Sequence, residues 1–182
     1  MKKAQNVRML ILDVDGVLTD GTILYTDAAE EYKCFNTQDG LGIRLLLQEG
    51  IRVALISGRK SKAVDCRARD LGLTDVYQGV GDKVAVFEQL LQKSTIEKKE
   101  VGFVGDDLVD LPLLTRVGFA VAVANAVEEV KRNADFITKN AGGHGAVREV
   151  CELILKSQGR WDSCLSRYLD GPQPSSSSKP RG

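Results

Sequence analysis

Residues 7–20 read Val-Arg-Met-Leu-Ile-Leu-Asp-Val-Asp-Gly-Val-Leu-Thr-Asp. The apolar run at 7–12 predicts a buried strand that ends at Asp13. Open α/β sheets bind ligands at the carboxyl ends of their strands, where Asp13 and Asp15 would stand. Residues two apart on extended backbone face the same side, so these carboxylates would repel in a partly dry crevice unless a cation intervened. The pair indicates a metal site, although a lone D-x-D caps the turn after a strand about as often.

The rest of the chain alternates apolar, β-branched runs with segments of helical period, which is typical of βα units on a parallel sheet. Strands are expected at 7–12, 53–56, 76–77, 101–104, 119–123 and 136–137. Helices are expected at 41–49, 61–71, 83–92, 108–117, 127–133 and 146–156. The predicted fold class is therefore α/β.

Two segments depart from this alternation. Residues 21–35 hold two β-prone runs around an Asp-Ala-Ala-Glu turn, which predicts a hairpin projecting from the sheet. Residues 171–182 contain three of the four prolines and no apolar side chain, so we expect a disordered tail after a single domain at 1–170.

A second acidic group follows the apolar run at 101–104. Residues 105–110 read Gly-Asp-Asp-Leu-Val-Asp, which places Asp106, Asp107 and Asp110 at or after the end of another strand. Acidic residues at two neighbouring strand ends supply hard oxygen ligands, which Mg²⁺ prefers and Zn²⁺ does not. Capping does not explain all five carboxylates.

Candidate phosphate donors follow two other strands. The run at 53–56 ends in Ser57-Gly-Arg, where a hydroxyl and loop amides can donate to phosphoryl oxygens, and Lys83 offers a cation at a predicted helix start. Taken singly, Ser57 is more often a helix cap and Lys83 a solvated surface residue. Their position at the same sheet edge favours a phosphate site.

Composition excludes several other classes. Lys plus Arg and Asp plus Glu both total 25, so the zero net charge disfavours a nucleic-acid partner. The longest strongly apolar run, at 117–124, is far shorter than the roughly 18 residues of a membrane span. The N-terminus lacks the features of a secretory signal, so a cytoplasmic protein is expected. No strand leads into G-x-G-x-x-G, which argues against a dinucleotide site.

The four cysteines and the single histidine do not suggest a zinc site. Cys34, Cys66, Cys151 and Cys164 are widely spaced, with no C-x-x-C pair. We expect reduced thiols that pack as small apolar groups. His144 lies in a glycine-rich segment, where an exposed loop residue is the simplest interpretation.

Four features, taken in their order along the chain, resemble the four motifs of the haloacid dehalogenase superfamily. They are D-x-D-G-V, a strand ending in Ser, a later Lys and G-D-D-x-x-D. Further segments, at 33–43, 56–60, 77–79 and 141–149, resemble the family of 3-deoxy-D-manno-octulosonate 8-phosphate phosphatases within it. The likeness extends to about residue 159. It implies a doubly wound, Rossmann-like parallel sheet with helices on both faces, the small hairpin and no cap domain.

The resemblance also implies a reaction, the Mg²⁺-dependent hydrolysis of a sugar-acid phosphate through an aspartyl-phosphate. Asp13 would be the nucleophile and Asp15 the acid and base, while Ser57, Gly58 and Lys83 would bind the phosphoryl group. Mg²⁺ would be held by the side chains of Asp13 and Asp106 and by the main-chain carbonyl of Asp15, with Asp107 and Asp110 beside it. Independently of the resemblance, a guanidinium at Arg59 could pair bidentately with a carboxylate of the substrate; the alternative is a surface arginine at a helix start.

The family further implies a homotetramer in which hairpins assemble and a neighbouring subunit shields the site, in a cytoplasmic step of lipopolysaccharide biosynthesis. Two features depart from the family: His144 stands where arginine is commoner, and the sequence after Trp161 lacks the family's short glycine-containing ending. These leave the chemistry intact and leave open the substrate preference and the role of the tail.

Three alternatives remain open at this point. A receiver-type signalling module also uses clustered acids, Mg²⁺, a hydroxyl and a lysine, but its acceptor aspartate lies on a later strand than the acidic pair. A catalytically silent assembly domain would retain the fold without turnover. A phosphatase for a nine-carbon sugar acid 9-phosphate would carry the same motifs, because a fold does not fix its substrate.

Overall fold

The structure, a computed structural model, describes residues 2–28 and 31–169. Its centre is a parallel sheet of six strands in the order β5-β4-β1-β6-β7-β8. These strands are β1 (Met9–Leu12), β4 (Arg52–Ile56), β5 (Asp75–Tyr77), β6 (Val101–Gly105), β7 (Phe119–Ala122) and β8 (Phe136–Ile137). Every residue of β1 is buried, as expected of a central strand covered on both faces.

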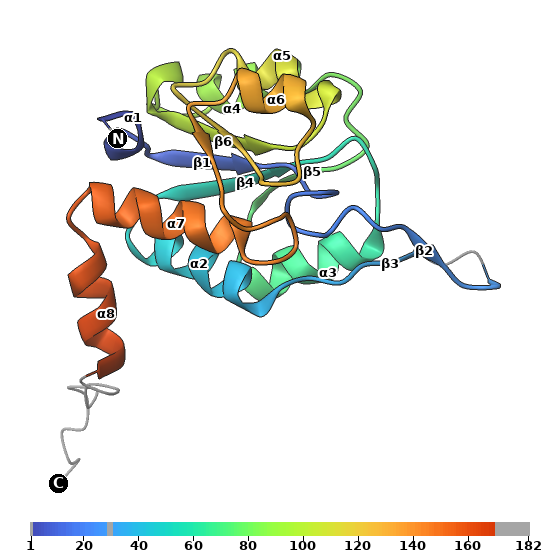
Figure 1. The fold of residues 1–182 in the computed structure, drawn as a ribbon, viewed down its shortest axis with the longest axis horizontal. Coiled ribbons are helices and arrows are strands. Elements are labelled where there is room, and N and C mark those ends of the chain that lie inside the picture. The colour runs from blue at the N-terminus through green and yellow to red at the C-terminus, as the bar shows by residue number, and fades with distance from the viewer. Residues whose placement is uncertain (1, 29–30, 170–182) are drawn as a thin grey trace, which may run out of the picture.

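Helices cover both faces of the sheet (Figure 1). One face carries α2 (Thr37–Gln48), α3 (Lys62–Leu71) and α7 (Ala146–Ser157), and the other carries α4 (Lys83–Gln92), α5 (Leu111–Leu114) and α6 (Glu128–Arg132). The predicted doubly wound α/β fold is confirmed.

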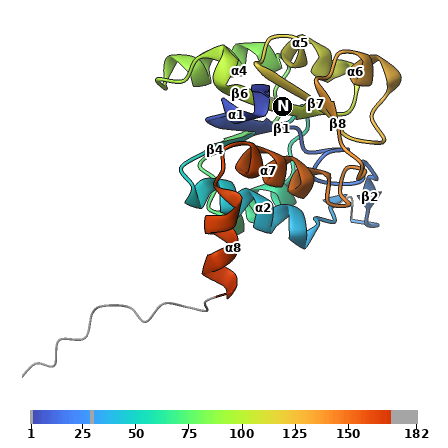
Figure 2. The same ribbon diagram turned by 60° about the vertical axis from the view of Figure 1, so that its left-hand side comes forward.

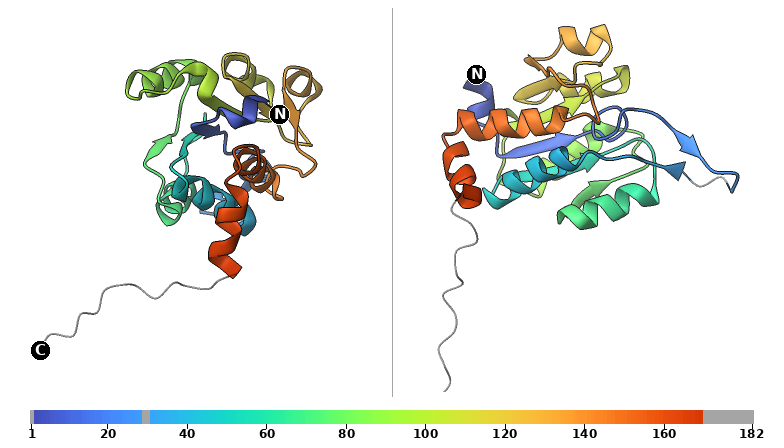
Figure 3. Two further views of the ribbon diagram at one scale, coloured as in Figure 1. Left: turned by 90° about the vertical axis from the view of Figure 1, so that its left-hand side faces the viewer. Right: turned by 60° about the horizontal axis from the view of Figure 1, so that its bottom comes forward.

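The hairpin is also present. Strands β2 (Leu24–Tyr25) and β3 (Glu31–Tyr32) pair antiparallel, with Leu24 opposite Tyr32 and Tyr25 opposite Glu31. It projects beyond the end of the sheet toward which β1 runs (Figure 3). No cap domain occurs within residues 2–28 and 31–169.

Several expected boundaries were wrong. The helix expected at 108–117 is instead a 3₁₀ turn, η2 (Leu108–Asp110), followed by the single-turn α5. Pro112 has no amide hydrogen to donate to the preceding turn, so it is tolerated in the first turn of α5 but not inside a longer helix. The helix expected at 41–49 begins at Thr37, where the Asn36 side chain accepts from the amides of Gln38 and Asp39. The first strand begins at Met9 rather than at residue 7, after the unexpected short helix α1 (Lys2–Gln5).

A further helix, α8 (Trp161–Leu169), was not expected. It lies at the opposite end of the molecule from the hairpin (Figures 1 and 3), and in Figure 2 it projects downward below α7 and α2. Cys164 is buried and lies 3.6 Å from Glu49, while Lys156 lies 4.8 Å from the Trp161 ring centre. The 3₁₀ turn η1 (Lys98–Glu100) precedes β6. The tail expected at 171–182 lies outside the described residues.

The cysteines are free thiols. The expected packing as small apolar groups holds for Cys151 and Cys164, which are buried, and is wrong for Cys34 and Cys66, which are exposed. His144 is an exposed loop residue, as expected. In the part of the chain that the structure describes, no helix is both long and apolar enough to cross a bilayer.

Candidate active site

The strand order creates a crevice at the carboxyl ends of β1, β4 and β6. The chain runs from β1 through β4 to the edge strand β5 and then crosses to β6 on the other side of β1. Such a switch point is where open α/β sheets bind ligands. A cleft of about 500 Å³ opens there, and eight of the nine residues predicted for the site line it: Asp13, Asp15, Ser57, Gly58, Arg59, Lys83, Asp106 and Asp107.

The ninth residue, Asp110, lies against the cleft but is fully buried. One carboxylate oxygen of each of Asp13, Asp106 and Asp110 lies within 4.8 Å of the others. The Lys83 Nζ atom lies 2.8 Å from Asp13 Oδ1 and 2.7 Å from Asp110 Oδ1. Two of the three carboxylates therefore pair with one ammonium group, and the third, Asp106, lies beside them.

Burial and mutual repulsion raise the pKa values of two of these carboxyl groups. Burial, together with the charge of Asp110, raises the pKa of Asp13 to about 6 despite the opposing effect of Lys83. Burial and the charges of Asp110, Asp13 and Asp107 raise the pKa of Asp106 to about 7. The three carboxylates carry more negative charge than Lys83 can neutralise. Because the possible metal ligands are all hard oxygen atoms, these residues fit a divalent cation such as Mg²⁺.

Two glycines allow other segments to pack closely against the first acidic loop. Gly16 has a φ of +84°, and a Cβ there would lie 2.0 Å from Asp106 Oδ2. A Cβ on Gly142 would lie 1.7 Å from the Gly16 carbonyl oxygen. The glycine-rich segment before α7 thus packs directly behind the first acidic loop.

The last two aspartates of the G-D-D-x-x-D motif also organise its backbone. Asp110 Oδ2 accepts from the Asp106 amide at 2.9 Å, and Asp107 Oδ1 accepts from the Leu108 amide at 2.7 Å. Asp107 is exposed at the rim, whereas Asp110 is buried beneath Asp106. Asp107 thus acts as a cap of the 3₁₀ turn, whereas Asp110 both organises this backbone and belongs to the carboxylate cluster.

The phosphate-donor candidates are fixed by short-range bonds. Ser57 is buried, and its Oγ accepts from the Arg59 amide at 3.2 Å. Lys83 is the first residue of α4, whose cap Asp82 accepts from the Val84 amide at 2.9 Å. The Ser57 hydroxyl can still donate to a ligand, because it acts here as an acceptor.

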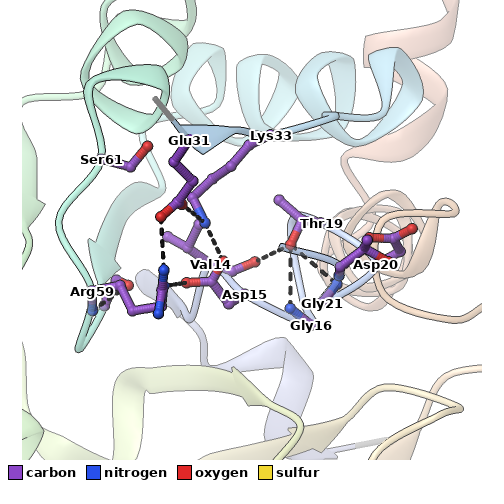
Figure 4. A network of polar contacts seen from close by, with 12 residues as sticks. Val14, Asp15, Gly16, Thr19, Asp20, Gly21, Glu31, Lys33, Arg59 and Ser61 are labelled. Carbon is purple, nitrogen blue, oxygen red and sulfur yellow. Dashed lines mark hydrogen bonds and ion pairs between the residues drawn. The ribbon is translucent and has the colours of Figure 1, made fainter. Parts of the chain in front are cut away.

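Asp15 lies apart from the carboxylate cluster, in a network with hairpin residues (Figure 4). The Lys33 ammonium donates to Asp15 Oδ1 and lies 2.6 Å from Glu31 Oε1. Arg59 donates to Glu31 Oε2 at 2.7 Å and to the Tyr25 hydroxyl at 3.0 Å. Sequence reasoning assigned no role to Lys33 or Glu31. Glu31 lies on β3 and Lys33 directly after it, so their spacing of two residues places both side chains on one face of the extended chain, but nothing in the sequence shows that this face meets Asp15.

Comparison with known proteins agrees with this geometry. A family model of haloacid dehalogenase-like hydrolases matches residues 69–150. The 3-deoxy-D-manno-octulosonate 8-phosphate phosphatase KdsC of Escherichia coli (strain B / BL21-DE3) is 51% identical over 169 residues, covering 93% of this chain and 90% of the relative.

Two solved structures have the same fold. The crystal structure of 3-deoxy-D-manno-octulosonate 8-phosphate phosphatase from Yersinia pestis has a TM-score of 0.87 at 45% identity, over 88% of this chain and 87% of that one. The Moraxella catarrhalis enzyme, crystallised with a magnesium ion, a phosphate ion and a KDO molecule, has a TM-score of 0.90 at 43% identity, over 92% and 96% of the two chains. At this identity and coverage, the chain belongs to the haloacid dehalogenase-like 3-deoxy-D-manno-octulosonate 8-phosphate phosphatase family.

Proposed function

We propose that this protein is a Mg²⁺-dependent phosphatase that converts 3-deoxy-D-manno-octulosonate 8-phosphate to the free sugar acid and phosphate. The observation that carries the proposal is the cluster of Asp13, Asp106 and Asp110, two of which pair with Lys83, at a cleft on the switch point of the sheet. The family membership supports it, as do the KDO molecule, the magnesium ion and the phosphate ion in the structure of the Moraxella relative. Membership of a phosphatase family disfavours both the receiver module and the silent assembly domain.

The reaction follows from the positions of two carboxyl groups at the end of β1. An Asp13 oxygen attacks phosphorus while the bond from phosphorus to the sugar oxygen breaks, and that oxygen takes a proton from Asp15. Water then attacks the phosphorus of the aspartyl-phosphate and gives a proton to Asp15, while the bond from phosphorus to Asp13 breaks. Phosphate leaves, and both side chains return to their starting states.

Mg²⁺ would be held by the side chains of Asp13 and Asp106 and by the main-chain carbonyl of Asp15, with Asp110 and Asp107 beside them. The bound ion supplies positive charge next to the phosphoryl group, which lowers its repulsion of an anionic nucleophile. Ser57, Gly58 and Lys83 would donate to phosphoryl oxygens during the transfer.

Arg59 would bind the carboxylate of the sugar acid. This role is supported by the position of Arg59, which lines the cleft and whose guanidinium pairs with a carboxylate, that of Glu31, in this structure. The bonds to Glu31 and Tyr25 raise the pKa of Arg59, so the side chain is permanently charged.

The assembly would be a homo-oligomer, a tetramer by family resemblance. The hairpin exposes Ile23, Leu24 and Tyr32, which a projection of this size cannot bury alone. The exposed free thiols of Cys34 and Cys66 support a reducing compartment, which fits a cytoplasmic step of lipopolysaccharide biosynthesis.

A substrate comparison tests the proposed specificity. Purified protein with Mg²⁺ should give a higher kcat/KM on the octulosonate 8-phosphate than on a nine-carbon sugar acid 9-phosphate. Preference for the nine-carbon ester would retain the chemistry but overturn the proposed substrate.

A further inference from the structure

Lys33 is a buried cation with no part in the reaction described above. It follows β3 at the base of the hairpin, yet its side chain is only 1% exposed. A buried ammonium group is costly unless it is paired, and Lys33 is paired with both Asp15 and Glu31. Burial opposes the charge, but the bonds to these two carboxylates outweigh it and raise the pKa of Lys33, so the group remains an ammonium.

The contacts of Asp15 are unequal at its two oxygens. Lys33 donates to Oδ1, whereas Arg59 Nε lies 3.9 Å from Oδ2, outside hydrogen-bond distance. Figure 4 shows Lys33 reaching Asp15 from the hairpin side. Lys33 therefore fixes the direction of the carboxyl group through one oxygen and leaves Oδ2 free of a hydrogen bond from the described residues.

Glu31 fixes Lys33 in turn. Its Oε1 lies 2.6 Å from Lys33 Nζ and its Oε2 accepts from Arg59 at 2.7 Å. Tyr25, opposite Glu31 in the hairpin register, accepts from the same guanidinium at 3.0 Å. The base of the hairpin is thus tied to the cleft within one chain, whatever the hairpin tip contacts.

We propose that Lys33 is a positioning residue: through Oδ1 it holds Asp15 so that Oδ2 faces the oxygen that leaves phosphorus. This inference rests on the proposed function, in which Asp15 gives that oxygen its proton. It predicts that Lys33 matters most where the leaving oxygen needs a proton, as an alkoxide does and a nitrophenolate does not.

The test compares two esters in the full-length protein with Mg²⁺. The rate of leaving-group release in the first turnover is measured for the octulosonate 8-phosphate and for p-nitrophenyl phosphate, with wild type and Lys33→Met. The inference predicts a loss of about 10²-fold on the sugar ester, a much smaller loss on the aryl ester and little change in KM. Lys33→Arg should recover part of the loss, and Lys99→Met, at an exposed lysine outside the cleft, should match wild type.

Equal losses on both esters would overturn the inference, as would a rise in KM for the sugar ester with kcat unchanged, because Lys33 would then bind substrate directly. If Lys33→Met does not fold, as judged by circular dichroism, Lys33→Gln is measured for the same ratio of losses. If wild type hydrolyses other alkyl phosphates but not the octulosonate, the proposed substrate fails, and the comparison is made with the best alkyl ester. Wild type that hydrolyses neither ester would overturn both proposals.

Discussion

Lys83 Nζ lies 2.8 Å from Asp13 Oδ1, so the first residue of α4 is joined to the first residue after β1 across the floor of the cleft. The same nitrogen lies 2.7 Å from Asp110 Oδ1, and both ion pairs are largely buried. The cation therefore fixes the carboxylate that we assign as nucleophile and would be the nearest positive charge to a phosphoryl group placed there.

Replacing Lys83 by methionine should slow phosphate release by about 10²–10³-fold, as expected for loss of one donor to a developing negative charge. Lys93→Met, at the other end of α4 and exposed, is the matched control and should leave turnover unchanged. Steady-state kinetics with saturating Mg²⁺ measures both. Turnover by Lys83→Met within a few-fold of wild type would remove Lys83 from the phosphate site.

The raised pKa values of Asp13, about 6, and Asp106, about 7, predict an unusual pH dependence of stability in metal-free protein. Both groups hold protons more tightly folded than unfolded, where the pKa is near 3.8. Their ionisation therefore disfavours the folded state, and stability is lost as pH rises from about 4 to about 7. Mg²⁺ should oppose this loss and raise Tm more at pH 8 than at pH 5.

Thermal unfolding in EDTA and in Mg²⁺ at the two pH values measures this. Asp106→Asn is the comparison variant, since it removes one of the repelling charges: its Tm in EDTA should fall less between pH 5 and pH 8, and its response to Mg²⁺ should be weak. A Mg²⁺-induced shift in wild type that is the same at both pH values would contradict the prediction.

Arg59→Ala should reduce kcat/KM for the octulosonate 8-phosphate far more than for a small phosphate ester without a carboxylate. The reason is that a guanidinium binds a carboxylate bidentately, and only the sugar acid offers one. The loss expected on the sugar acid is about 10- to 100-fold, the usual contribution of a charge-assisted bond. If the two esters lose equally, Arg59 serves the phosphoryl group or the hairpin contact instead.

The exposed pair Leu24 and Tyr32, opposite one another in the hairpin, should form part of a subunit interface. Replacing both by serine should yield smaller species in multi-angle light scattering, because their apolar surface would no longer be buried between copies. Leu169→Ser, at an exposed position on α8, is the control and should not alter the mass. An unchanged oligomer in the double variant, or a fully active wild-type monomer, would refute the interface.

Most residues that line the cleft could be predicted from the sequence, because several of them directly follow strands. Asp13, Ser57 and Asp106 each come immediately after an apolar run, and parallel strands bring their carboxyl ends to one edge of the sheet. The prediction needed only the order of the strands and not their exact ends. The error in the expected start of β1 therefore did not affect the predicted site.

Other features depend on contacts that sequence patterns do not reveal. Lys33 resembles any solvated lysine, and only the fold shows that the hairpin returns it to Asp15. Helix α8 was missed although its apolar residues recur at helical spacing, at Trp161, Cys164, Leu165, Tyr168 and Leu169. The start of α2 is obscured by Gly40 and Gly42 within its first two turns.

The most direct test measures phosphate released from 3-deoxy-D-manno-octulosonate 8-phosphate by wild type and Asp13→Asn, each in Mg²⁺ and in excess EDTA, with circular dichroism confirming that both proteins fold. Wild type in Mg²⁺ should turn over the ester, wild type in EDTA should not, and Asp13→Asn should be at least about 10³-fold slower because an amide lacks the anionic nucleophile. Full activity in EDTA, or appreciable turnover by folded Asp13→Asn, would contradict a metal-dependent reaction through Asp13.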